Sequence, residues 1–219
     1  MSKSELTQII RRAEVTDKYS AIKSLCNGRK VLDVGCIGQD ATMDSENWLH
    51  NIIRSVATSV TGVDISAEKI DKFNNLGYHM LQHSQLEKQN DMYEVIIMAD
   101  VIEHVNDPVD FLRFYARFLT DSGLMVVTTP NANRAVNFFS ILFLNNYSVN
   151  VEHTCWFCPK TLYEVIRRSG MKFAEIYWLK KYYNYKGLSF ASSIVTGLSD
   201  LLAFFRKNYS QNFMVVLSK

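Results

Sequence analysis

The sequence has few features that would indicate a domain linker, a disulfide framework or a signal segment. Its 219 residues include 3 prolines and 9 glycines, and no repeat, low-complexity tract or Pro/Gly-rich linker interrupts them. One domain is therefore expected over residues 1–219. The polar amino terminus has no apolar region of the signal-peptide kind. The 4 cysteines lack the spacing of a disulfide framework, so a reduced, cytoplasmic protein is expected. The single pair Cys155 and Cys158 supplies too few ligands for structural zinc.

An excess of charge of one sign is also absent from the chain as a whole, whose net charge is +2. The charges are nevertheless unevenly distributed. Residues 160–219 carry 10 Lys and Arg against 3 Asp and Glu, whereas residues 1–159 carry 14 against 19. A basic carboxyl-terminal third suits an anionic acceptor or a membrane surface, and equally an ordinary solvated face.

Short apolar runs rich in β-branched residues alternate with helical patterns. The predicted strands are residues 30–34, 59–64, 78–81, 94–98, 124–128, 173–178 and 212–217. Predicted helices between them begin at Ser66, Asp107 and Pro159, and glycines follow two of them at Gly77 and Gly170. This alternation predicts right-handed βαβ units. The expected fold class is α/β: a doubly wound, mainly parallel seven-stranded sheet flanked by helices, Rossmann-like, with its last strand antiparallel. Its ligands should lie beyond the carboxyl ends of the strands.

The first such loop, in "VLDVGCIGQD", lacks the third glycine of the G-x-G-x-x-G fingerprint that binds a dinucleotide pyrophosphate. A carboxylate beside two phosphates would also be repelled. S-adenosylmethionine instead carries a cationic sulfonium and ammonium, which suit Asp33, and it needs only close backbone approach at Gly35 and Gly38. Asp64 ends the second predicted strand, where an acid can bind both ribose hydroxyls or, alternatively, cap the following helix.

The stretch "ADVIEHV" follows the strand at 94–98, where a methyl donor and its acceptor should meet. It holds Asp100, Glu103 and His104 within one turn, and a neutral imidazole is a suitable base for an acceptor hydroxyl. His153, in "VEHTCW", is expected on the same side of the sheet. The alternative is that Glu103 and His104 only bond neighbouring loops. The histidines at 50, 79 and 83 do not lie in a comparable group of acids and histidines in the sequence.

These motifs, with "VTGVDIS", "GLMVVTTPN" and "EHTCWFCPKTLYEVIRRSGM", resemble in order those of class I S-adenosylmethionine-dependent methyltransferases. The resemblance covers about residues 28–178 and the final strand. The motifs are most similar to those of the small-molecule and polysaccharide-cluster branch, which includes the ubiquinone-pathway O-methyltransferases. The usual acid after the third strand is replaced by "QHSQ", so His83, Ser84 or Gln85 would hold the adenine.

The resemblance implies S-adenosylmethionine as the cofactor and assigns two sets of residues. Those expected to bind the cofactor are Asp33, Gly35, Gly38, Asp64, Ile65, His83, Ser84 and Asp100. Those expected to be catalytic are His104, Glu103 and His153. Asp100, Glu103, His104 and His153 also resemble the divalent-metal ligands of small-RNA 3′-end methyltransferases. Metal-free base catalysis by His104 is preferred here, and no metal is predicted.

Two apolar stretches stand apart, at residues 135–144 and 188–205. The second contains Asp200 and several hydroxyls, so a transmembrane span is not expected. Core or lid helices are the simpler interpretation, and a surface for lipid or a lipid-linked acceptor is the alternative. With Lys180, Lys181, Arg206 and Lys207, residues 188–207 are the candidate for peripheral membrane contact.

The expected function is O-methylation of a sugar, glycan precursor or lipid-linked small molecule, within polysaccharide biosynthesis. Residues 1–27 are expected to form an amino-terminal helical segment, and 131–158 and 179–210 the acceptor-side or lid segments. The partner is a small-molecule or glycan acceptor and not DNA, and no oligomeric state is predicted. The alternatives are an RNA 2′-O-methyltransferase and a non-catalytic ligand-binding module of the same fold.

Overall fold

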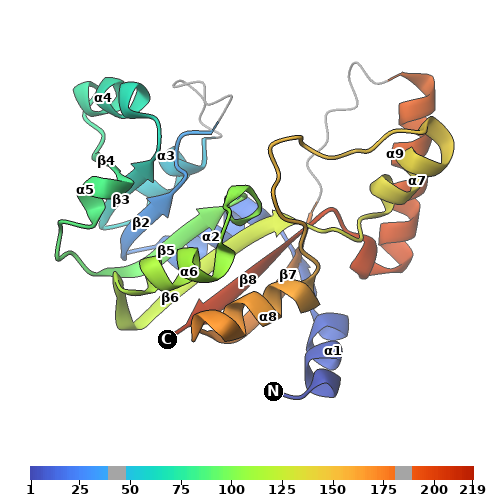
Figure 1. Cartoon of the computed structure of the whole chain (residues 1–219), viewed down its shortest axis with the longest axis horizontal. Helices are drawn as coiled ribbons and strands as arrows, with labels where there is room; N and C mark the ends of the chain where they lie inside the picture. The colour runs from blue at the N-terminus through green and yellow to red at the C-terminus, as the bar shows by residue number, and fades with distance from the viewer. Residues whose placement is uncertain (39–47, 181–188) are drawn as a thin grey trace.

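The computed structural model describes residues 1–38, 48–180 and 189–219, and its centre is one twisted sheet (Figure 1). Eight strands lie in the order β1-β7-β8-β6-β5-β2-β3-β4. Their bounds are β1 Glu14–Thr16, β2 Lys30–Val34, β3 Ser59–Asp64, β4 Met80–Gln82, β5 Tyr93–Ala99, β6 Leu119–Pro130, β7 Lys172–Leu179 and β8 Asn212–Ser218. All seven predicted strands are present, which confirms the fold class. The eighth, β1, was not predicted, because its three residues are too short a run to show a period.

Strand direction follows the expected pattern. β2, β3, β4, β5 and β6 run parallel to one another, and β1 is parallel to β7. β8 runs antiparallel to both β6 and β7, which confirms the prediction for the last strand. Strand order reverses between β2 and β5, so the loops that follow these two strands face each other across the switch point, where α/β sheets bind ligands.

Helices cover both faces of the sheet. They are α1 Lys3–Arg12, α2 Lys18–Cys26, α3 Leu49–Arg54, α4 Ala67–Asn75, α5 His83–Leu86, α6 Pro108–Ala116, α7 Ala135–Leu144, α8 Pro159–Ser169 and α9 Phe190–Phe205, with short 3₁₀ turns at Ile102–His104 and Lys207–Tyr209. Alternate residues of each strand point to opposite faces. Leu32 and Val34 therefore pack in the core with α1, α6 and α8, whereas Val31 packs with α2 and α3.

The predicted helix boundaries have local causes. Asp107 accepts hydrogen bonds from the backbone N–H groups of Val109 and Asp110, so it caps α6 as expected. Gly170 ends α8 in the left-handed conformation, with φ of 87°. Ser66 does precede α4 but its side chain makes no capping bond.

Three expectations need correction or lie outside the description. Residues 1–27 are not helical throughout, because β1 separates α1 from α2. The segment 39–47, which lengthens the first connection, lies outside the described residues, as do Lys181 and Leu188 of the basic and apolar stretch.

Among the described residues, no helix is long and apolar enough to cross a membrane. α7 and α9 pack on each other and project from the end of the sheet where β6 finishes and β8 begins (Figure 1).

Candidate active site

A cleft of about 620 Å³ lies at the carboxyl ends of β2, β3 and β5. Residues from the loops after these strands line it, and one side of α6 closes it. Of the residues predicted to bind the cofactor, the cleft is lined by Gly35, Gly38, Asp64, Ile65, His83 and Asp100. Its size is within the range of small-molecule sites. The position is the one expected for the ligand of a doubly wound sheet.

Gly35 forms the floor of this cleft. Its φ is +68°, a conformation that glycine adopts without a steric penalty. A Cβ built at this position would lie 2.5 Å from Cγ2 of Val101. The side-chain-free backbone therefore allows the loops after β2 and β5 to approach each other. By contrast, a Cβ at Gly38 would meet no atom of the described residues within 4 Å.

Asp64 presents an oriented carboxylate at the end of β3. One oxygen accepts hydrogen bonds from the N–H groups of Ile65 and Ser66, at 2.8 and 3.1 Å. The other accepts from the N–H of Ile37 at 3.0 Å. These bonds hold the carboxylate while it still lines the cleft, and the oxygen that accepts only from Ile37 keeps a lone pair for a ligand hydroxyl. Ile65 beside it is 95% exposed, as a residue covering a bound ligand would be.

Asp100 carries a constraint that the sequence did not reveal. Its φ is 57°, uncommon for a residue with a side chain. Its carboxylate accepts a hydrogen bond from Thr128 Oγ1 at 2.9 Å and lies 2.5 Å from Nζ of Lys18, at the start of α2. Lys18 is 82 residues away along the chain, and no sequence signal links the pair. Asp100 therefore faces the cleft as a carboxylate already partly neutralised by a cation.

One wall of the cleft is aromatic. His83 stacks on Phe114, with ring centroids 4.1 Å apart, and its Nδ1 lies 3.1 Å from the hydroxyl oxygen of Tyr115. Phe111 and Tyr115 line the cleft beside it. His83, one of the candidates for holding the adenine, thus lies at the cleft among aromatic side chains. Ser84 is exposed and is not among the lining residues, so the structure gives no support to its cofactor role.

Asp33 is the main departure from the predicted cofactor set. It is 2% exposed and does not line the cleft. Its Oδ2 lies 2.8 Å from Nδ1 of the equally buried His50. The buried carboxylate thus has a polar partner on α3, and this pair joins α3 to β2.

Glu103, His104 and His153 come together, as predicted, although two separate loops carry them. The rings of His104 and His153 meet edge to face with centroids 4.6 Å apart. Potential ligand atoms of the three residues lie within 4.8 Å of one another. The loops are joined because the backbone carbonyl of Glu103 accepts hydrogen bonds from the N–H groups of Thr154 and Cys155. His104 lines the cleft, so this cluster touches the expected cofactor region.

The protonation of this cluster is unusual. Burial, together with the charge of Asp100, raises the pKa of Glu103 to about 8, so this acid keeps its proton at neutral pH. Its Oε2 accepts a hydrogen bond from Thr129 Oγ1 at 3.0 Å. Burial and the neighbouring His104 and Arg134 lower the pKa of His153, which favours its neutral imidazole. At neutral pH the cluster therefore includes a neutral acid and a neutral imidazole.

The donor set allows a divalent metal but differs from the four-ligand group considered from the sequence. One carboxylate and two imidazoles are suitable first-row transition-metal ligands. Asp100 is not in the group, because Lys18 and Thr128 hold its carboxylate. A metal would also have to displace the proton of Glu103. The residues fit a three-ligand site that competes with protons.

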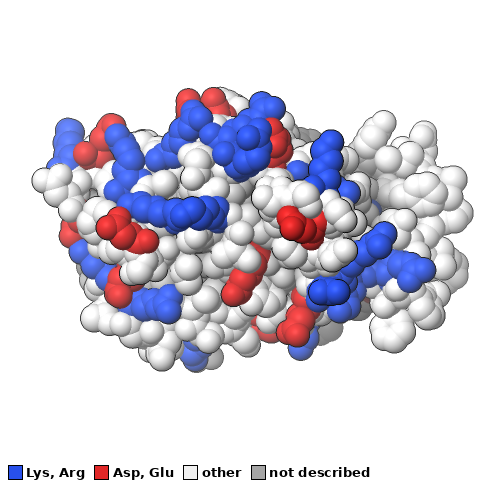
Figure 2. All heavy atoms as spheres, turned by 90° about the horizontal axis from the view of Figure 1, so that it is seen from below, with Lys and Arg blue, Asp and Glu red and all other residues white. Residues whose placement is uncertain are grey.

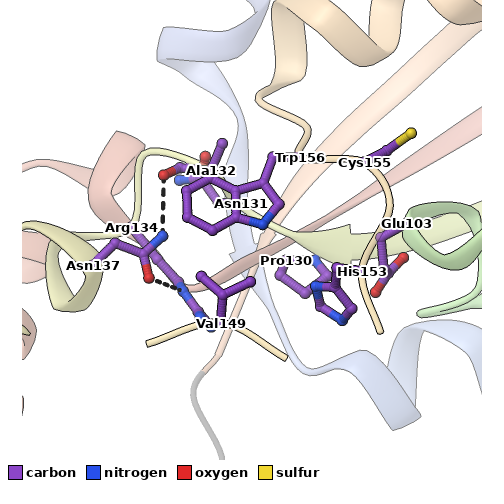
Figure 3. Close-up of a pocket in the computed structure, with 10 residues that line it drawn as sticks. All are labelled: Glu103, Pro130, Asn131, Ala132, Arg134, Asn137, Val149, His153, Cys155 and Trp156. Carbon is purple, nitrogen blue, oxygen red and sulfur yellow. Dashed lines mark hydrogen bonds between the residues drawn. The ribbon is translucent and has the colours of Figure 1, made fainter. Parts of the chain in front are cut away.

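A second, smaller pocket adjoins the cluster on the other side (Figure 3). Glu103 and His153 stand at one end of it, and Arg134 and Asn137 at the other, with the Trp156 ring between. Arg134 Nε donates to the side-chain oxygen of Asn137 at 2.8 Å, and Asn137 Nδ2 donates to the carbonyl of Ala132 at 3.2 Å. The pocket therefore has a polar, internally bonded wall beside a histidine.

A groove of about 880 Å³ lies beside the second pocket, between the start of α7 and the end of α9. Ala132, Arg134 and Asn137 line both spaces, so the two adjoin each other. Phe138 and Leu202 give the groove apolar walls. The groove, the second pocket, the histidine cluster and the cleft therefore lie next to one another, from the α7–α9 pair to the carboxyl ends of the central strands.

Comparison with known proteins identifies the class. The model of a methyltransferase domain family matches residues 7–176. A ubiquinone biosynthesis O-methyltransferase of Rickettsia typhi is 25% identical over 155 residues, covering 67% of this chain and 61% of the relative. A probable S-adenosylmethionine-dependent methyltransferase of Mycobacterium tuberculosis is 29% identical over 125 residues, 55% of this chain and 42% of the relative. The matches thus cover less than two thirds of these relatives.

A solved structure shares the whole fold. The S-adenosylmethionine-dependent methyltransferase of Archaeoglobus fulgidus superposes with a TM-score of 0.60 at 15% identity, covering 100% of both chains. The chain belongs to the methyltransferase domain family, and within it to the class I enzymes that depend on S-adenosylmethionine. The predicted family and cofactor are confirmed. The cleft fits that cofactor, because its floor is a glycine backbone and carboxylates of Asp64 and Asp100 line it.

Proposed function

We propose that the chain methylates a hydroxyl group of an amphipathic small molecule, and that the acceptor reaches the cofactor from the α7–α9 side. The observation that supports this proposal is the adjacency of the apolar groove, the second pocket and His153, whose ring contacts His104 at the cofactor cleft. A sugar or glycan acceptor has less support, since the groove walls include Phe138 and Leu202. The relatives compared above are named for ubiquinone biosynthesis or only as methyltransferases, not for polysaccharides.

The chain's own residues have distinct tasks in this reaction. Gly35, Asp64 and Asp100 would hold the cofactor, which supplies a methyl group on a sulfonium when bound. His104 would orient the acceptor hydroxyl and take its proton as the oxygen–carbon bond forms, since a neutral imidazole is a competent base at physiological pH. His153, in contact with His104, would hold the acceptor from the second pocket. Alignment of donor and acceptor provides most of the acceleration.

Neutral Glu103 has a supporting part in this scheme. A protonated carboxyl can donate a hydrogen bond as well as accept one. One of its oxygens lies within 4.8 Å of a ring nitrogen of each histidine, so it would be a polar neighbour of both without placing a negative charge in the pocket. The carboxylate of Asp100 would then be the negative charge closest to the cationic end of the cofactor.

The test is turnover of radiolabelled S-adenosylmethionine with a panel of hydroxylated acceptors: alkyl-substituted phenols, sugars and an oligoribonucleotide. Labelled ether from the amphipathic phenols alone supports the proposal. Transfer confined to sugars or to RNA contradicts the acceptor class. His104→Ala should lower turnover at least about 100-fold, the usual contribution of a general base. His79→Ala, at an exposed histidine in no described pocket, is the matched control and should keep full activity.

Chelation decides between base and metal. Turnover that survives exhaustive chelation but is lost in His104→Ala supports the base. Activity that disappears on chelation and returns only with added metal assigns Glu103, His104 and His153 to metal binding. Full activity in both His104→Ala and His153→Ala would remove the cluster from the mechanism.

A further inference from the structure

Helix α9 is apolar on the outside. The large side chains that it exposes recur every three or four residues and so form one face: Phe190, Ile194, Leu198, Leu201, Phe204 and Phe205. Its buried residues are smaller and more polar: Val195, Thr196 and Ser199. A helix on a water-soluble core has the reverse arrangement, with its apolar stripe buried. Phe204 is 82% exposed and Phe190 is 84% exposed.

Helix α7 repeats this arrangement. It exposes Phe138, Ile141, Leu142 and Phe143. It buries two polar residues, Asn137 and Ser140, together with Ala135 and Val136. α7 and α9 pack against each other, so their outer sides contribute to the same projecting end of the molecule (Figure 1). An exposed apolar area built from two helices marks an interaction surface.

The charges around this surface indicate its partner. α7 contains no charged residue, and α9 contains only Asp200. Figure 2 shows the end of the molecule that holds these helices free of Lys, Arg, Asp and Glu on that face, with Lys and Arg gathered beside it. Arg206 and Lys207 follow α9 directly and are exposed. An apolar face bordered by cations matches a bilayer, where acyl chains meet anionic headgroups.

We propose that the outer faces of α7 and α9 dock on the surface of an anionic lipid bilayer. This rests on the proposed function, because the groove between the same two helices adjoins the second pocket, which His153 lines. Docking would place the mouth of the groove at the headgroup level. An acceptor whose apolar part stays in the membrane would then present its hydroxyl to the histidines without crossing water. A second copy of the chain is the competing occupant, but it would bring the same cations together.

Vesicle flotation of the full chain tests the surface. The probes are vesicles of phosphatidylcholine alone and of phosphatidylcholine mixed with phosphatidylglycerol. The chain is expected to float with the mixed vesicles and much less with phosphatidylcholine alone. Phe204→Glu should weaken partitioning about tenfold or more, because it places a charge on the inserted face. Arg206→Glu should weaken it about fivefold or more and only toward the anionic vesicles.

Leu76→Glu is the matched control. Leu76 is 58% exposed, as Leu142 is, but it follows α4 at the opposite end of the molecule (Figure 1). Its variant should float like the unaltered chain. No flotation with anionic vesicles, or equal flotation of Phe204→Glu, would overturn the proposal. The proposal would also be overturned if sedimentation analysis showed a dimer that Phe204→Glu dissociates, in a chain that does not bind the vesicles.

Calorimetric binding of S-adenosylhomocysteine and turnover of a short-chain soluble phenol, measured on the same samples without vesicles, separate the two proposals. If both persist while flotation is absent, the membrane surface fails and the methyltransferase function stands. If flotation persists in a chain that methylates only sugars or RNA, the surface stands and the acceptor class fails.

Discussion

Glu103 should make the stability of the folded protein depend on pH in the direction opposite to that of an ordinary surface carboxylate. It is 2% exposed, and its burial with the nearby Asp100 raises its pKa from 4.5 to about 8. Between these two pH values the unfolded chain has released this proton and the folded chain has kept it. The free energy of unfolding therefore falls by about 1.4 kcal/mol for each pH unit in this window. This stabilisation is complete below pH 4.5 and lost as pH rises through about 8.

Glu103→Gln isolates this effect. Glutamine has nearly the same shape, stays neutral, and its amide oxygen can still accept the hydrogen bond from Thr129. The variant should lose the falling slope between pH 5 and pH 8 and should exceed the unaltered chain at pH 9 by several kcal/mol, to order of magnitude. Urea denaturation followed by circular dichroism, in buffers with chelator, measures both. Glu68→Gln removes an exposed carboxyl on α4 and is the control.

Two results would refute this reasoning. Identical pH slopes for the unaltered chain and Glu103→Gln would mean that Glu103 is ionised in the folded protein at neutral pH. A variant that is less stable at pH 9 would mean that the carboxylate is a favourable charge there, as it would be with a cationic partner. Either outcome would also change the proposed chemistry, since the second pocket would then hold a negative charge beside His153.

Three further predictions concern the cofactor cleft. Gly35→Ala should weaken binding of S-adenosylhomocysteine and lower the free energy of unfolding by about 1–2 kcal/mol, because the new Cβ meets Val101 at a residue with left-handed backbone conformation. Calorimetry and thermal unfolding measure the two effects, and a variant with unchanged binding and stability would contradict this geometry. Asp64→Ala should weaken the same binding by roughly 1.5–3 kcal/mol, the value of hydrogen bonds to a charged group, and equal affinity would exclude a contact with the ligand. Lys18→Met should raise the preference for S-adenosylmethionine over S-adenosylhomocysteine, because Asp100 loses its cationic partner and attracts the sulfonium more strongly. An added attraction of about 1 kcal/mol corresponds to a roughly fivefold change in the ratio of the two affinities. An unchanged ratio would show that Asp100 does not interact with the sulfonium.

The parts of the fold that sequence could predict are those governed by local periodicity. The seven runs of β-branched residues became strands, and the loops after them met at one edge because parallel strands align their carboxyl ends. Gly35 and Asp64 could be located for the same reason, since each directly follows or ends a strand. β1 could not, because three residues with one apolar side chain, Val15, carry no period. Its pairing with β7 depends on a partner more than 150 residues away.

Contacts between residues far apart in the chain could not be predicted from the sequence for a similar reason. Lys18 reaches Asp100 across 82 residues, and His50 reaches Asp33 across 17. Each pair joins a helix to a strand end, so it exists only after the helix has packed on the sheet. The second pair could not be foreseen from the motif: Asp33 has the motif position of a ligand contact, but it is buried beside His50 and does not line the cleft.

The apolar stretches show what periodicity leaves open. The spacing of large side chains in α9 identifies one face of a helix, but it does not say whether that face turns toward the protein or away. Here Thr196 and Ser199 turn inward and Phe204 outward. The inward faces of α7 and α9 therefore include polar side chains, while much of the apolar surface of both helices stays in contact with water. A bilayer that covers the outer faces would supply the missing burial, and it would at the same time stabilise the groove between them. The surface and the acceptor path are thus expected to depend on each other, so charged substitutions on the outer face should impair turnover of membrane-held acceptors more than that of short soluble ones.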